Sequence, residues 1–293
     1  MQLATRSIPE LHVSNHQARD RAGHLADLAF RGLIAEAELT PKPALVDERG
    51  SGAHVDLSLA LMKRSAQSLR KSFELMALVS FRRDPSQSLR EELGAIGRDA
   101  ERSMLKITEG VNTHRGAIWA LGLLVSAAAS GFNRPGVVAR RAGQLARIPD
   151  SLAPTPLSNG SKVTRRYHIS GARGEAQGGF PHVVSIALPT LHRSRSRGAG
   201  ENCARLDALL AIITKLDDTC LLHRGGLSAL DAAQHGAAAV LATGGTCSAR
   251  GWELLQQLDR DLINRNVSPG GSADLLAATL FLDLLAGRPP TKR

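Results

Sequence analysis

Aromatic residues are scarce in this chain of 293 residues, at only 3%, with a single Tyr and two Trp. Hydrophobic residues nevertheless make up 43%, so a core has to be built from Leu, Ala, Val and Ile. Ala and Leu are strong helix formers, whereas aromatic side chains favour strands. The composition therefore predicts closely packed helices, and the chain is long enough to bury a sizeable core.

Cysteine is also scarce, and Cys203, Cys220 and Cys247 are widely spaced. Three such residues are too few for a disulfide framework, have no CxxC metal spacing, and fit a reducing cytosol. The N-terminal segment lacks the apolar centre of a signal peptide, and no apolar run reaches the roughly 18 residues of a membrane span. We therefore expect a cytoplasmic protein that has no membrane partner.

Lysine is rare as well, since it supplies only seven of the 37 basic residues, and the net charge of +10 is carried almost entirely by arginine. The guanidinium group pairs with phosphate oxygens two at a time, which suits nucleic acid or a small ligand with several phosphates. High arginine content on a surface can equally reflect genomic composition. Few aromatics for base stacking and no zinc-finger spacing argue against nucleic acid, so a small polyphosphate ligand is the expected partner.

Apolar residues recur at spacings of three and four along most of the chain, which predicts helices. The expected helices cover residues 21–39, 57–81, 89–109, 115–129, 204–216, 228–242, 248–265 and 273–285. The helix over 115–129 is apolar almost all round and is expected at the centre. Residues 1–20 are polar and predicted to be a loosely ordered tail, and 149–162, 171–181 and 192–200 are predicted loops. No long strand pattern occurs, so we predict an all-α fold with one compact helical domain over 21–293.

The first of four loops that could carry chemistry spans residues 42–56. Lys42 could contact phosphate, and Asp47, His54 and Asp56 could bind metal or transfer protons, beside glycines that allow close approach of a ligand. The alternative is an ordinary capping loop in which Asp56 caps the next helix, and this loop by itself favours that alternative.

Two further loops repeat a His-Arg-Gly triplet. His114 and Arg115 stand before the apolar helix, where free N–H groups and the helix dipole favour an anion; alternatively, Thr113 caps and His114 faces solvent. His223, Arg224 and Gly225 follow Asp217 and Asp218. Two carboxylates at the end of an apolar helix oppose the helix dipole, which favours a bound cation there.

The fourth loop contains Gly270, Gly271 and Ser272 just before a helix, and Asp274 follows. A Gly-Gly turn at a helix start can cradle phosphate, although this one lacks the P-loop pattern. The alternative is a plain cap in which Ser268 or Ser272 accepts the first backbone N–H groups. One such turn is weak support, but four glycine loops with Asp, His or Arg are harder to explain as caps alone.

Together these segments resemble the triphosphoribosyl-dephospho-coenzyme A synthase family. The matching stretches run from about residue 36 to 280 in the family's order: TPKPALVDERGSGAHVD, VNTHRGAIWALGLL, GARGEAQGGFP, DDTCLLHRGG and NVSPGGSADLLA. The stretches RGSGAHVDLSLALMKRSAQSL and GARGEAQGGFP are more similar to the malonate decarboxylase type than to the citrate lyase type. Cys220 departs from the pattern, because many relatives have a polar residue there.

The resemblance implies transfer of the triphosphoribosyl group of ATP to the 2′-hydroxyl of 3′-dephospho-CoA, with release of adenine. The product would serve the acyl-carrier subunit of malonate decarboxylase and be transferred to it by a separate enzyme. A nearby carboxylate would stabilise the oxocarbenium-like transition state, and Mg²⁺ would neutralise the triphosphate. The resulting site hypothesis has three parts: phosphate contacts from Lys42, His114, Arg115, His223, Arg224, Gly225, Gly270, Gly271 and Ser272; metal ligands Asp217, Asp218 and Asp274; and proton transfer by Asp47, His54 or Asp56.

Two other functions compete with this one. An ADP-ribose-type glycohydrolase is also helical, uses Asp-Asp-Thr segments with Mg²⁺, and cleaves a ribosyl C–N bond, but it needs no acceptor. An arginine-rich RNA-binding module would bind unrelated RNA with a steep salt dependence, and gives no reason for Asp and His beside glycine.

Overall fold

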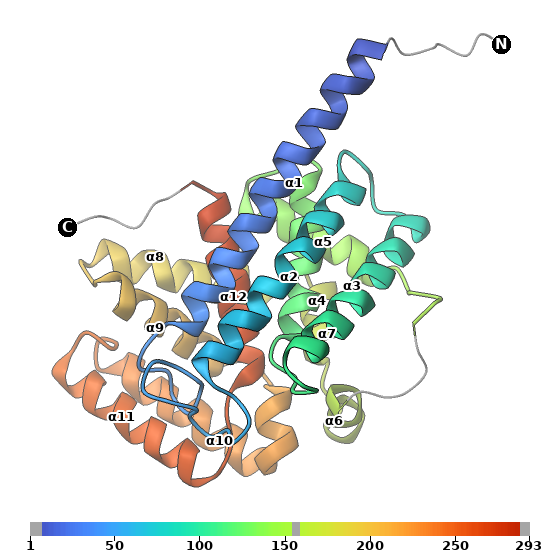
Figure 1. Ribbon diagram of the computed structural model, residues 1–293. Helices are drawn as coiled ribbons and strands as arrows, with labels where there is room; N and C mark the ends of the chain where they lie inside the picture. The colour runs from blue at the N-terminus through green and yellow to red at the C-terminus, as the bar shows by residue number, and fades with distance from the viewer. Residues whose placement is uncertain (1–7, 154–158, 288–293) are drawn as a thin grey trace.

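The computed structural model describes residues 8–153 and 159–287, and these form helices connected by loops (Figure 1). No strand occurs among them, apart from one isolated bridge between Asp47 and Gly50. The helices are α1 (Ile8–Ala37), α2 (Leu59–Ser80), α3 (Gln87–Ile107), α4 (Arg115–Ala129), α5 (Pro135–Arg147), α6 (Asn159–Tyr167), α7 (Gly171–Gln177), the π-helical turn η1 (His182–Ala187), α8 (Leu188–Ser196), α9 (Glu201–Ile213), α10 (Thr219–Ala242), α11 (Ala249–Asn264) and α12 (Gly270–Leu285). The predicted all-α fold is confirmed.

The two most apolar helices, α4 and α12, lie in the middle of the molecule. All but three residues of α4 are buried, as its sequence predicted, and most of α12 is buried too. The long helix α1 packs along α2, α4 and α12, while α9 and η1 cover another part of α12 (Figure 1). The first turns of α4, α10 and α12 and the loop after α1 face a common space, and this arrangement positions the site.

Several segments differ from the expectation. Helix α1 begins at Ile8 instead of residue 21, and Ala18 is already buried against the core; residues 1–7 of the expected tail lie outside the described residues. Helix α5 was not predicted, although Pro135 at its first position is a common helix start.

The two segments predicted as loops at 171–181 and 192–200 are largely helical, in α7 and α8. In α8 the polar residues that suggested mobility have buried partners: Ser194 donates to Asp207 (2.7 Å) and Arg195 pairs with Asp283 (2.8 Å). Because these partners lie on distant helices, tertiary contacts override the local preference for a loop.

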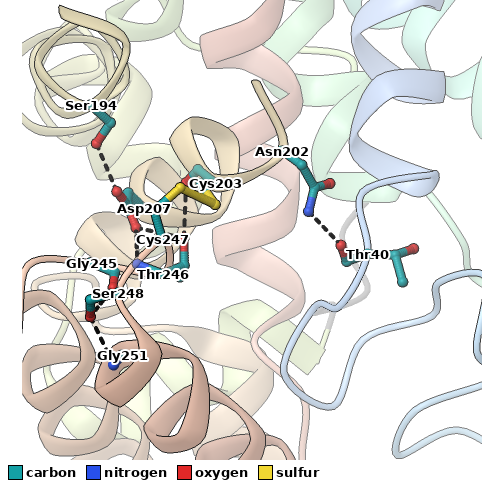
Figure 2. The surroundings of a disulfide bond; sticks show 10 residues. All are labelled: Thr40, Ser194, Asn202, Cys203, Asp207, Gly245, Thr246, Cys247, Ser248 and Gly251. Atoms are coloured by element: carbon teal, nitrogen blue, oxygen red, sulfur yellow. Dashed lines mark hydrogen bonds between the residues drawn. A yellow bond between two sulfur atoms is a disulfide. The ribbon is translucent and has the colours of Figure 1, made fainter. Parts of the chain in front are cut away.

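Cys203 and Cys247 form a disulfide, which corrects the expectation that these thiols stay reduced (Figure 2). The bond joins α9 to the turn between α10 and α11. In the same turn, Thr246 donates through its backbone N–H and its hydroxyl to buried Asp207. Beside the disulfide, Asn202 donates to the carbonyl of Thr40 at 2.7 Å, which connects α9 to the loop after α1.

Removing this disulfide should lower the free energy of unfolding. The two cysteines are 44 residues apart, so the bond restricts a long loop of the unfolded chain, an effect of about 2–4 kcal/mol. Urea unfolding of Cys203→Ser against wild type measures it. Reductant should lower the stability of the wild type only, and an equal response of both proteins would contradict the assignment.

No helix in the described ranges combines the length and the apolar character that crossing a membrane requires.

Candidate active site

A cavity of about 620 Å³ lies between the loop after α1 and the first turns of α4, α10 and α12. It brings together most of the residues that the sequence singled out, from Lys42 to Asp274, which are 232 positions apart. Those that line it are Lys42, His54, Asp56, His114, Arg115, Asp217, His223, Arg224, Gly270, Gly271 and Asp274. Asp47, Asp218, Gly225 and Ser272 are not among the lining residues.

Asp47 holds the shape of the loop between α1 and α2. Its carboxylate accepts the backbone N–H of Lys42 at 2.8 Å and pairs with the guanidinium of Arg49 at 2.8 Å. Asp259 of α11 holds the same loop by accepting the backbone N–H of Ala44 and pairing with Arg49. Asp47 is buried away from the cavity, so the predicted role in proton transfer does not fit its position. Asp56 caps no helix, because Ser58 is the N-cap of α2.

His54 is held in one orientation by two polar neighbours. The guanidinium of Arg224 lies 3.0 Å from Nδ1, and Ser268 Oγ lies 2.8 Å from Nε2. A guanidinium can only donate, so Nδ1 accepts and Nε2 carries the hydrogen that is donated to Ser268. Burial and the charge of Arg224 lower the pKa of His54 to about 4, so the ring is neutral near pH 7. With both nitrogens engaged, His54 orients Arg224 and has no free lone pair for a base.

His114 is buried at the cavity wall, at only 2% exposure, which excludes the solvent-facing alternative. Its Nδ1 lies 2.8 Å from Ser65 Oγ, which in turn lies 2.6 Å from Thr113 Oγ1, and Nε2 has no hydrogen-bond partner among the described residues. Burial and the charge of Lys42 lower the pKa of His114 to about 3. The ring is therefore neutral at physiological pH, and it cannot attract phosphate as an imidazolium. Thr113 is not the cap either, since His114 occupies the N-cap position without a side-chain bond.

Asp218 caps two helices at once. Its Oδ1 accepts the N–H of Cys220 (2.9 Å) in α10 and of Gly271 (3.2 Å) in α12. Its Oδ2 accepts the N–H and the hydroxyl of Ser272, at 2.8 and 2.9 Å. Burial raises the pKa of Asp218, opposed by these hydrogen bonds.

The prediction of a bound cation here assumed that Asp217 and Asp218 stand at the end of an apolar helix, and that assumption was wrong. Helix α9 already ends at Ile213, and Asp218 is the N-cap of α10, where a carboxylate is favourable. Ser268 and Ser272 do not cap α12; Asp218 accepts its first N–H groups from outside the helix. Gly271 admits that carboxylate, because a Cβ there would lie 3.1 Å from Asp218 Oδ1.

The predicted magnesium ligands do not fit a metal site held by the protein. The four hydrogen bonds of Asp218 occupy both of its oxygens, and Asp217 is exposed. Within the described ranges, no three His, Cys, Asp or Glu side chains are grouped as a metal would require.

The cavity wall also contains acidic and aromatic residues to which the sequence assigned no role. Glu36 and Glu101 lie on helix faces without any motif, whereas Glu175, Trp119 and Phe180 lie in stretches that carry the family resemblance, and all five line the cavity. Asp56, Asp217 and Asp274 bring the acidic side chains that line the cavity to six. The lining cations are Lys42, Arg115 and Arg224. Lys42 pairs with Glu36 and Arg115 with Glu101, whereas no carboxylate pairs with Arg224 in the part of the chain described. Arg224 is therefore the cation most available to an anionic ligand.

Stability should fall in mild acid because His114 is neutral in the folded protein. Its folded pKa of about 3 lies below the unfolded value, so below roughly pH 6.5 the unfolded chain binds a proton that the folded protein does not. The free energy of unfolding then decreases by about 2 kcal/mol from pH 6.5 to pH 5 through this residue. Urea unfolding across that range should show a smaller decrease for His114→Asn than for wild type, and equal slopes would contradict the assignment.

Comparison with known proteins finds one family model, described as ATP:dephospho-CoA triphosphoribosyl transferase, which matches residues 22–292. A 2-(5''-triphosphoribosyl)-3'-dephosphocoenzyme-A synthase of Klebsiella pneumoniae is 53% identical over 278 residues, which cover 94% of this chain and 99% of that protein. A probable synthase of the same name from Pseudomonas savastanoi pv. phaseolicola is 56% identical, over 91% of this chain and 93% of the relative. No solved structure matches.

Proposed function

The chain belongs to the ATP:dephospho-CoA triphosphoribosyl transferase family and is a transferase, and we propose that its cavity joins the triphosphoribosyl group of ATP to the 2′-hydroxyl of 3′-dephospho-CoA with release of adenine. The observation that supports this most is the meeting of Arg224, the Gly270-Gly271 turn and several carboxylates around one cavity. A guanidinium suits a triphosphate, and carboxylates suit a positive charge at the ribose carbon.

We assign the roles among the lining residues as follows, with their positions in the cavity as support. Arg224, oriented by His54, contacts the triphosphate, with Arg115, His223 and the Gly270-Gly271 turn around it. Asp56 takes the proton of the acceptor hydroxyl, because its carboxylate is half exposed and lines the cavity. Magnesium enters with ATP as the counterion of the triphosphate, and no protein ligand is assigned to it. A cytoplasmic setting belongs to the same proposal, since ATP and dephospho-CoA are intracellular metabolites.

Incubation with ATP, magnesium and dephospho-CoA tests the reaction. We expect adenine release to depend on dephospho-CoA, together with a mass gain of one triphosphoribosyl group on the acceptor. Adenine release at the same rate without the acceptor would favour the glycohydrolase alternative, and no release would contradict both.

We further propose that the product serves the acyl-carrier subunit of malonate decarboxylase, after transfer by a separate enzyme. The support is the similarity of residues 49–69 and 171–181 to that type. The competing setting is citrate lyase. Expression of the chain in strains lacking the synthase of either pathway separates them: growth on malonate, and not on citrate, is the expected result.

A further inference from the structure

The floor of the cavity contains a buried ion pair. Lys42 Nζ donates to the backbone carbonyl of Glu36 at 2.7 Å and to its Oε1 at 2.5 Å. The two side chains are 2% and 5% exposed, and both line the cavity. The Lys42 backbone is fixed as well, since its N–H donates to Asp47 and its carbonyl accepts from Arg49. The ammonium group of Lys42 is therefore neutralised by the carboxylate of Glu36.

Asp274, in the first turn of α12, lies on the same floor. A Cβ on Gly116 would approach Asp274 Oδ2 to 2.0 Å, so the carboxyl group packs directly on the first turn of α4. There it accepts the backbone N–H of Ala117. No ion pair to Asp274 occurs within the described ranges.

The surroundings of Asp274 favour its neutral form. The carboxylates of Glu36 and Asp218 lie near it, together with the Cys220 thiol. Burial raises the pKa of Asp274 well above its usual range, and the charges of Glu36 and Asp218 raise it further. Among the residues that the structure describes, the backbone N–H of Ala117 opposes this rise in pKa. These surroundings therefore favour the protonated carboxylic acid form of Asp274 over the carboxylate.

We propose that Asp274 is the general acid of the reaction, and that the Glu36–Lys42 pair is a positioning pair that keeps it protonated. This inference rests on the proposed function, because it assigns the group that assists the departure of adenine. Adenine leaves poorly as an anion, and protonation of a ring nitrogen removes that difficulty, as for leaving groups in glycoside hydrolysis.

The proposed step balances. The bond between ribose C1 and adenine N9 breaks, its electron pair stays with adenine, and the Asp274 proton passes to a ring nitrogen. The 2′-oxygen of dephospho-CoA forms the new bond to C1 and loses its proton to Asp56. Exchange with solvent then deprotonates Asp56 and reprotonates Asp274, so no further reactant is needed.

A substrate whose leaving group needs no proton tests the acid role. Nicotinamide riboside triphosphate releases neutral nicotinamide, whereas ATP needs proton transfer to adenine. We expect Asp274→Asn to lose about 100-fold or more in kcat with ATP, but less than about threefold with the nicotinamide substrate. Asp261→Asn, an exposed carboxylate of α11, is the matched control and should behave as wild type with both.

Equal losses with both substrates would overturn the acid role and favour a binding or structural one. A second variant, Gly116→Ala, displaces the carboxyl group without removing it, and should show the same selective loss with ATP. The proposed function fails separately, through the absence of dephospho-CoA-dependent adenine release in the wild type.

The pH dependence of kcat tests the role of the Glu36–Lys42 pair. Glu36→Gln removes the negative charge that raises the pKa of Asp274, so Asp274 ionises at lower pH in this variant. The alkaline decrease of kcat with ATP should therefore shift to lower pH in Glu36→Gln, while the nicotinamide substrate shows no such shift. An unchanged pH profile with ATP would overturn the positioning role.

Discussion

Asp218→Asn should lower the free energy of unfolding by about 3 kcal/mol, because one side chain accepts four hydrogen bonds at the first turns of α10 and α12. The amide places an NH₂ group against backbone N–H groups, so at least one helix start loses its acceptor. The Gly270-Gly271 turn should move as well, so activity falls together with stability. Urea unfolding and adenine release measured on the same preparation test this expectation.

Asp217→Asn is the matched control, because it is the neighbouring carboxylate and is exposed. Its unfolding free energy should stay within about 0.5 kcal/mol of wild type, as is usual for surface substitutions. If Asp218→Asn were as stable as wild type and lost only magnesium-dependent activity, the capping account would be wrong and a metal role would be favoured.

Arg224→Ala should reduce kcat/KM for ATP by about 100-fold, since a guanidinium that contacts phosphate contributes about 3 kcal/mol through charge-assisted hydrogen bonds. The other two lining cations already pair with carboxylates and cannot replace it. The loss should appear mainly in the KM for ATP, because the phosphates are bound before and during the reaction. Steady-state kinetics with varied ATP measures it.

Arg265→Ala serves as the control, because Arg265 is exposed and its guanidinium contacts only Ser228 among the described residues. It should keep the wild-type kinetics. Arg224→Lys should recover only part of the activity, since lysine keeps the charge but not the planar pair of donors. Full activity of Arg224→Ala would show that phosphate binds elsewhere.

The helices could be predicted where a local pattern decides the structure. The run from Arg115 to Ala129 is apolar on all sides, and both its boundaries and its burial were expected. Glycine loops were also recognisable, because glycine marks places where the backbone turns or approaches a neighbour closely. That these loops share one cavity was a hypothesis that follows from chemistry, since separate loops with complementary groups suit one ligand.

The remaining features depend on contacts between distant segments. Asp218 looked like a charge at a helix end because its real partners, Gly271 and Ser272, are more than fifty positions away. Glu36 lies within an ordinary helical pattern, and its importance appears only when Lys42 is folded back onto it. The disulfide between Cys203 and Cys247, which are 44 positions apart, could not be predicted from the spacing of the cysteines either.

The most direct test is a crystal structure of the Asp274→Asn variant with ATP, magnesium and dephospho-CoA, because slow turnover should preserve both substrates. We predict the triphosphate against Arg224 and the Gly270-Gly271 turn, with the adenine ring beside position 274 and the acceptor hydroxyl near Asp56. A nucleotide bound outside this cavity, for example in the smaller pocket beside Trp252 and Arg260, would contradict the account.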